Sequence, residues 1–183
     1  MNNKIYIGVD PGKEGAIAIY ENNEYYIIKF PKIGNDYDMK ALKEYFRLIK
    51  KQTNKKLHLI LEDVKPMQMV KSKGDWELSR GKTLIESLCH FFNFPFTMVS
   101  PKEWQKEMHQ GIEPVKDKTN RKNKNGEYVY KKNAKETSKL AAQRLFPNID
   151  LRDPDRKTDK AKKIHDGVCD AILMCEYGRR KNL

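Results

Sequence analysis

Cysteine is scarce in this sequence, and long apolar runs are absent from it. The three cysteines, Cys89, Cys169 and Cys175, are too few for a disulfide framework, and no two have the spacing of zinc ligands. No stretch approaches the roughly 18 apolar residues of a membrane span, and no signal-peptide or nucleotide-binding glycine motif is found. We therefore expect a cytoplasmic protein with no membrane contact and no small-molecule cofactor.

Acidic residues are also few relative to basic ones. The 183 residues include 25 Asp and Glu against 37 Lys and Arg, which gives a formal charge of +12. A chain of this length, 38% hydrophobic, can bury the core of one domain. So large a positive charge indicates an anionic partner, either nucleic acid or an acidic membrane surface.

The excess positive charge lies in the C-terminal half. Residues 116–135 hold eight basic side chains against two acidic ones, 156–163 hold five against one, and 179–181 hold three. The first run has no apolar stripe for a membrane, whereas Tyr128 and Tyr130 within it could stack on bases or sugars. A solvated loop is the alternative interpretation. We predict that this run contacts nucleic-acid phosphates through Lys116, Lys118, Arg121, Lys122, Lys124, Lys131 and Lys132.

The hydrophobic pattern predicts an α/β fold with a mixed five-stranded sheet flanked by helices. Strands are expected at 4–9, 15–20, 24–30, 57–61 and 94–99. Helices are expected at 38–51, 76–92, from Pro101 after a Ser100 cap, at 134–146 and at 164–177. Residues 65–74 are expected to form a loop, 110–133 a basic mobile loop and 178–183 a basic tail.

Four acidic residues fall where such a fold can bring them together. Asp10 follows the first strand and Glu62 ends the fourth, and strand ends are where sites assemble in α/β sheets. Asp166 and Asp170 are four residues apart on the last helix, so they share a face, and their repulsion invites a cation. The helix around them is apolar and should be buried, and buried carboxylates need a partner.

Each of these acids also has an ordinary explanation. Asp10 can form an Asx turn, Glu62 can be a surface charge with Asp63 as a competitor on the opposite face, and Asp166 can cap its helix. His165 is either a helix-capping or surface residue, or a general acid–base or metal ligand. Together, however, the four acids favour a site for Mg²⁺, for which Mn²⁺ should substitute. Two such ions about 4 Å apart would stabilise the attacking and leaving oxygens of phosphodiester hydrolysis.

The same residues belong to an ordered set of motifs that resembles a known family. The set comprises Gly8-x-Asp10-Pro11-Gly12, Leu61-Glu62, Val99-x-Pro101-x-x-Trp104, Lys135-Glu136, Arg144-Leu145-Phe146-Pro147 and Asp166-Gly167-x-x-Asp170-Ala171. From about Ile5 to Arg180 the chain resembles RuvC-type Holliday junction resolvases of the ribonuclease H-like superfamily, above all their phage-encoded and phage-like branch.

The resemblance implies a single nuclease domain over residues 1–183 with a ribonuclease H-like fold. It implies a homodimer that nicks paired strands of four-way and other branched DNA, with two Mg²⁺ ions in each active site. It further implies Asp10, Glu62, Asp166 and Asp170 as catalytic metal ligands, and Lys135 as a catalytic group near the scissile phosphate. The compartment would be the cytoplasm of a bacterium, or of the host of a phage.

Two features depart from the pattern of bacterial RuvC. Its final acids are three residues apart, whereas here Gly167 precedes Asp170 by three residues and Asp166 precedes it by four. Asp166 and His165 therefore compete for that position. Bacterial RuvC also has a junction-probing aromatic residue shortly after its catalytic glutamate, where this sequence reads Lys65-Pro66-Met67.

Other functions share parts of this pattern. A ribonuclease H-like nuclease acting on RNA or an RNA–DNA hybrid has the same fold, but in ribonuclease H the glutamate lies on the first helix. An actin-like sugar kinase needs a second domain that this chain is too short to hold. A non-catalytic branched-DNA-binding protein would explain the charge but not the four acids. We therefore predict a Mg²⁺-dependent junction-resolving endonuclease.

Paired cutting predicts two subunits, because one chain holds one set of four acids and two opposed strands must be cut. The helix at 76–92 supplies more apolar surface than one sheet face needs, through Leu84, Ile85, Leu88, Phe91 and Phe92. The resemblance also implies a dimer interface on this helix. We therefore expect the interface there.

Overall fold

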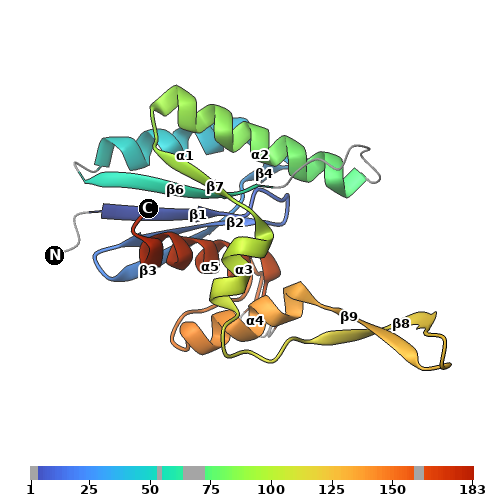
Figure 1. The fold of residues 1–183 in the computed structure, drawn as a ribbon. Coiled ribbons are helices and arrows are strands. Elements are labelled where there is room, and N and C mark those ends of the chain that lie inside the picture. The colour runs from blue at the N-terminus through green and yellow to red at the C-terminus, as the bar shows by residue number, and fades with distance from the viewer. Residues whose placement is uncertain (1–3, 53–54, 64–72, 159–162) are drawn as a thin grey trace.

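The computed structural model describes residues 4–52, 55–63, 73–158 and 163–183 (Figure 1). Its centre is a five-stranded sheet with the strand order β3-β2-β1-β6-β7. The strands are β1 (Lys4–Val9), β2 (Ala16–Glu21), β3 (Glu24–Lys29), β6 (Lys56–Glu62) and β7 (Phe96–Val99). β1 pairs antiparallel with β2 and parallel with β6, so the sheet is mixed. The predicted α/β fold class is confirmed.

Helices cover both faces of the sheet (Figure 1). α1 (Met39–Gln52) and α2 (Lys73–Phe92) lie on one face, and α5 (Asp166–Lys181) lies on the other. α3 (Pro101–Met108) and α4 (Ala134–Leu145) pack against α5, and a small hairpin of β4 (Lys32–Ile33) and β5 (Asp36–Tyr37) precedes α1. No helix of the described residues is long and apolar enough to cross a membrane.

Alternation along the central strands divides the core into two halves. Ile5, Ile7 and Val9 of β1 pack with α1 and α2, whereas Tyr6 packs with α5. On β6, Leu59 and Leu61 also pack with α1 and α2, and Ile60 packs with α5. Because side chains alternate with period two, Glu62 lies on the α5 side of the sheet, as the sequence predicts.

The prediction of a loop over residues 110–133 is wrong for most of this segment. It contains a two-stranded hairpin, β8 (Lys116–Lys122) and β9 (Tyr128–Lys132), which projects from the body of the molecule beyond α4 (Figure 1). The Asn123 side chain accepts the backbone N–H groups of residues 125 and 127, and Gly126 closes the turn with φ +80°. Neither strand has a buried side chain, so the sequence shows no apolar alternation there.

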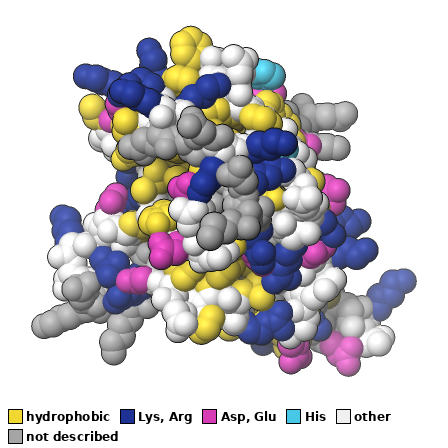
Figure 2. Space-filling view, turned by 90° about the vertical axis from the view of Figure 1, so that its left-hand side faces the viewer, with side chains coloured by type: hydrophobic (Ala, Val, Ile, Leu, Met, Phe, Trp, Pro, Cys, Tyr) yellow, Lys and Arg dark blue, Asp and Glu magenta, His cyan; other side chains and the backbone are white. Residues whose placement is uncertain are grey.

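The expected basic tail is largely helical, since α5 continues to Lys181. Arg179 and Arg180 both donate to Glu176, and Lys181 pairs with Glu107 at 2.5 Å. Figure 2, which views the end of the molecule that holds both chain termini, shows Lys and Arg side chains interspersed with Asp and Glu. The three basic side chains of this segment are therefore partly neutralised by two acidic ones within the fold.

The apolar surface that the sequence assigns to a dimer interface serves mostly the protein's own core. Ile85 and Leu88 on α2 are buried against the sheet, and Leu84 and Phe92 are packed beside them. Only Phe91 of the predicted set is well exposed, at 69%. The apolar side chains of α2 exceed what one sheet face needs because α2 packs against α1 as well as against the sheet.

Two predicted segments lie largely outside the described residues. They are the loop at 65–74, with Lys65-Pro66-Met67 inside it, and residues 159–162 of the second basic run. The other helix and strand boundaries agree with the predicted ones to within a few residues.

Gly8 allows α5 to lie directly on β1. A Cβ atom at Gly8 would lie 2.2 Å from the carbonyl oxygen of Ala171 and 2.4 Å from the amide nitrogen of Cys175. Both are backbone atoms, so the helix would have to move. We predict that Gly8→Ala lowers the free energy of unfolding by about 3 kcal/mol in urea denaturation.

The matched control is Ile7→Val, the neighbouring core position, which removes one methyl group and should cost about 1 kcal/mol. If Gly8→Ala costs no more than this control, the close contact between β1 and α5 is incorrect.

Candidate active site

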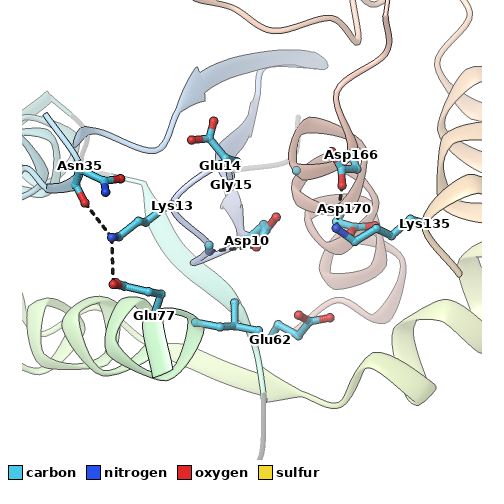
Figure 3. Close-up of a pocket in the computed structure, with 13 residues that line it drawn as sticks. Asp10, Lys13, Glu14, Gly15, Asn35, Glu62, Glu77, Lys135, Asp166 and Asp170 are labelled. Carbon is cyan, nitrogen blue, oxygen red and sulfur yellow. Dashed lines mark hydrogen bonds and ion pairs between the residues drawn. The ribbon is translucent and has the colours of Figure 1, made fainter. Parts of the chain in front are cut away.

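One pocket of about 560 Å³ brings together all five predicted catalytic residues (Figure 3). The pocket is lined by Asp10, Glu62, Asp166, Asp170 and Lys135. Asp10 directly follows β1, Glu62 ends β6, the other two aspartates lie on α5 and the lysine lies on α4. Residues separated by up to 160 positions in the sequence therefore meet at one end of the sheet.

The sheet topology explains why the first two carboxylates meet. β1 and β6 are adjacent and parallel, with Val9 opposite Leu61, so Asp10 and Glu62 leave the same edge of the sheet side by side. The first turn of α5 reaches this edge because Gly167 has no side chain. A Cβ atom there would lie 2.4 Å from the carbonyl oxygen of Glu14 and 3.0 Å from Asp10 Oδ2.

Asp10 forms the Asx turn that the sequence suggests as the alternative to a functional role, and it also lines the pocket. The Gly12 N–H donates to Asp10 Oδ1 at 3.0 Å, which fixes the carboxylate. The other oxygen lies beside α5. Burial raises the pKa of Asp10 to about 6, against the opposing effect of the Gly12 N–H. The two interpretations are therefore compatible: the turn orients the carboxylate.

Glu62 is held by a tryptophan whose role the sequence does not reveal. Trp104 is fully buried, as a core residue should be, but its Nε1–H donates to Glu62 Oε1 at 3.0 Å. Burial raises the pKa of Glu62 to about 7, and this hydrogen bond opposes the rise. The competing Asp63 forms an ion pair with Lys82 at 2.7 Å and does not line the pocket.

Asp170 is the one of the four acids whose ionised form its surroundings disfavour most. Its Oδ1 is buried and has no hydrogen-bond partner among the described residues. Burial, and then the charge of Asp10, raise its pKa well above the ordinary value, and the Ser138 hydroxyl opposes this only in part. Ser138 is bonded in turn to the buried His109, with 3.0 Å between Oγ and Nε2. This support from α4 was not predicted.

Asp166, and not His165, lines the pocket. His165 is the N-cap of α5: its Nδ1 accepts the N–H of Val168 at 3.3 Å, so the prediction of a capping histidine is confirmed and Asp166 is not the cap. Lys135 Nζ donates to Asp166 Oδ2 at 2.8 Å. Burial would raise the pKa of Asp166, but this bond leaves it below the ordinary value and raises the pKa of Lys135.

A second lysine, which sequence reasoning missed, stands on the other side of the pocket. Lys13 Nζ pairs with Glu77 at 2.9 Å and donates to the carbonyl oxygen of Asn35 at 2.7 Å (Figure 3). Its position directly after Asp10-Pro11-Gly12 is the signal that could have identified it.

The chemistry of the pocket fits a divalent cation. Within the described residues, no three acid, histidine or cysteine side chains already form a metal-binding cluster. However, six acidic residues line the pocket, since Glu14 and Glu77 join the four predicted ones. Of those four, one has a buried unpaired oxygen and three have pKa values raised by burial. Such carboxylates are the hard oxygen ligands that Mg²⁺ prefers, and a positive charge among them would offset their desolvation.

The predicted nucleic-acid-binding residues lie outside this pocket, on the β8–β9 hairpin and its turn. All seven are exposed. The hairpin joins α4 through Asn133, two residues before Lys135. The basic run is therefore connected directly to the edge of the acidic pocket.

No family model matches this sequence, and no curated protein does. Among solved structures, Thermus thermophilus RuvC in complex with a Holliday junction substrate aligns with 97% of this chain and 96% of its own, with a TM-score of 0.55 and 8% identity. The chain has the fold of RuvC. A second Thermus thermophilus RuvC structure aligns over the same shares, with a TM-score of 0.45 and 10% identity. The predicted ribonuclease H-like architecture is confirmed.

The raised pKa of Asp10 predicts a stability that falls with pH. In the unfolded chain Asp10 loses its proton near pH 4, whereas in the folded protein it keeps it to about pH 6. Between these values the unfolded state binds fewer protons, so stability falls as pH rises and stays lower above pH 6. Asp10→Asn cannot ionise, so in EDTA at pH 8 it should be about 1–3 kcal/mol more stable than wild type.

The gain should nearly disappear at about pH 3.5, where Asp10 of the wild type is mostly protonated in both the folded and the unfolded state. Asp36→Asn is the control, because Asp36 is exposed and its hydrogen bonds lower its pKa, so this change should not stabilise the protein at pH 8. Urea unfolding at both pH values measures the difference. Equal stability of Asp10→Asn and wild type at pH 8 would contradict the buried charge.

Proposed function

We propose that this protein is a Mg²⁺-dependent endodeoxyribonuclease that resolves four-way (Holliday) junctions, and other branched DNA, by paired nicking. One observation carries the proposal: four carboxylates and Lys135 line a single pocket at the edge of the sheet. The fold supports it, because the chain shares that fold with a RuvC that was solved in complex with a Holliday junction substrate. Within the proposal, the protein is a RuvC-type resolvase of the phage-like branch and acts in a bacterial or phage-host cytoplasm.

Asp10, Glu62, Asp166 and Asp170 would hold two Mg²⁺ ions, with Mn²⁺ as a substitute. When bound, these ions supply a nucleophilic water and stabilise the attacking and leaving oxygens of the phosphodiester. The protein fixes two of the ligands in advance: the Gly12 N–H orients Asp10, and the Trp104 indole orients Glu62. Rigid support of this kind favours a single ligand geometry.

Lys135 supplies a cation at the edge of the same pocket. Its side chain is 72% exposed and bonded only to Asp166 among the groups that line the pocket, so it is free to move. With DNA present, the ammonium group would contact an oxygen of the scissile phosphate instead of Asp166 Oδ2. That exchange would release Asp166 as a ligand at the moment when the substrate binds.

Cleavage of a synthetic four-way junction tests the proposal. In Mg²⁺, Asp10→Asn and Asp170→Asn should abolish nicking, while junction binding in EDTA stays within about threefold of wild type because the basic hairpin is unchanged. The matched control is Asp63→Asn, next to Glu62 but paired with Lys82, which should still cut.

Each opposing outcome has a distinct meaning. Cleavage at the wild-type rate by Asp10→Asn or Asp170→Asn would contradict the metal-ligand assignment. Preferred cleavage of an RNA–DNA hybrid would favour the ribonuclease H-like alternative. Junction binding with no cleavage in Mg²⁺ or Mn²⁺ would favour a non-catalytic DNA-binding protein.

The proposal includes a homodimer, since each chain carries one pocket and paired cutting needs two. On α2, Phe91 and Trp76 are exposed, at 69% and 55%, and they remain available to a partner. Because Leu88 belongs to the core, its substitution would test folding instead of assembly.

Phe91→Asp should therefore give a folded monomer that nicks junctions one strand at a time. Sedimentation at micromolar concentration measures the association state, and a cruciform plasmid distinguishes nicked from linear products. Tyr26→Asp, which alters an exposed aromatic residue on β3, is the control and should remain dimeric. A wild-type monomer that cuts both strands in one binding event would exclude the dimer.

A further inference from the structure

The β8–β9 hairpin has two chemically different faces. Lys116 lies opposite Lys132 and Lys118 opposite Tyr130, while Tyr128 lies opposite Lys122. The register shifts between Lys118 and Lys122, but directly paired residues share a face and residues alternate along β9. One face therefore carries four lysines and two tyrosines: Lys116, Lys118, Lys122, Lys132, Tyr128 and Tyr130. We call this the Lys/Tyr face. The opposite face holds the cross-strand pair Asp117 and Lys131, together with Val129.

The two tyrosines of the Lys/Tyr face are in different situations. Lys118 Nζ lies 3.5 Å from the centroid of the Tyr128 ring, and Lys122 Nζ lies 5.0 Å from it. Tyr128 therefore holds two ammonium groups in place by cation–π attraction. Tyr130 is 58% exposed, and none of the cation–π contacts among the described residues involves it. Its ring is open to a flat partner.

The hairpin is built as a fixed arm. At its base, the Asn133 N–H donates to the carbonyl oxygen of Val115 at 2.8 Å, and the Asn133 side chain donates to Asp117 at 2.8 Å. The Val115 N–H donates to Thr137 on α4. α4 also carries Lys135, so the arm is attached to the helix that borders the acidic pocket.

No part of the described chain covers the Lys/Tyr face, since every residue of β9 is exposed. Four lysines on one face attract an anionic partner, and an open tyrosine ring beside them suits a base better than a phosphate. Bases inside a duplex are stacked on one another and unavailable to a side chain. The partner that fits both features is a nucleic-acid strand with unpaired bases.

We propose that the Lys/Tyr face of the hairpin binds an unpaired DNA strand, with Tyr130 stacked on a base and the lysines on the phosphates. This deepens the proposed function, on which it rests for the identity of the DNA, because the base pairs beside a branch point lack a stacking neighbour on one side and open more easily than those inside a duplex. The hairpin would then guide a strand toward the pocket beside Lys135.

Fluorescence anisotropy tests the proposal without cleavage, in EDTA, with a labelled oligothymidine of about 12 nucleotides and a blunt duplex of the same length. Tyr130→Ala should weaken oligothymidine binding by about 5- to 150-fold, the range for one lost base–aromatic stack. Duplex binding should change by less than about twofold, since the charge is unaltered. Tyr130→Phe should restore binding of the oligothymidine.

The matched control is Val129→Ala on the opposite face, also exposed, which should leave both affinities unchanged. The assignment would be overturned if Tyr130→Ala lost as much affinity for the duplex as for oligothymidine. It would also be overturned if Val129→Ala lost as much affinity for oligothymidine as Tyr130→Ala. An acidic peptide that competes as well as oligothymidine would overturn it too, because the hairpin would then be a general anion site. None of these outcomes depends on nuclease activity, so failure here and failure of the proposed function are distinguishable.

Discussion

The parallel pairing of β1 with β6, with α5 lying against both, is the constraint on which the rest of the structure depends. It brings Asp10, Glu62 and Asp170 into one poorly solvated space, where burial raises the pKa of each. Such an arrangement costs stability when the groups ionise. Proteins retain buried like charges chiefly where a function needs them, and here a cation would offset the cost. The pocket is therefore best understood as a site whose folding and chemistry are coupled.

Much of the surrounding structure supports this arrangement. Gly8 and Gly167 allow backbone to approach backbone, so α5 lies close enough for its acids to reach the strand ends. Trp104 on α3 then donates a hydrogen bond to Glu62, and Ser138 on α4 lowers the pKa of Asp170. Substitutions at these supporting positions should affect the site without touching a substrate, because they act through the carboxylates. The α5 half of the core thus serves both packing and positioning.

The sequence predicts the sheet, the helices and the four acids because each has a local signal. Alternation in β6 determines the face of Glu62, and the spacing of Asp166 and Asp170 determines a shared helix face. The sequence does not reveal the hairpin, because its strands bury no side chain. It does not reveal the role of Trp104 either, because a hydrogen bond from a buried indole has no signal in the sequence. Most of the apolar side chains that predict a dimer surface on α2 belong to the core, because apolar periodicity cannot show whether a helix covers its own sheet or a partner.

The most direct test of the account is the effect of Mg²⁺ on thermal stability at pH 8. Binding to the folded state alone raises the midpoint of unfolding with ligand concentration. If the four carboxylates form a metal site, the midpoint of the wild-type protein rises steadily with Mg²⁺ concentration, and the rise disappears in Asp170→Asn. A wild-type midpoint that does not respond to Mg²⁺, or an equal response in Asp170→Asn, would contradict the claim that the four carboxylates form a metal site.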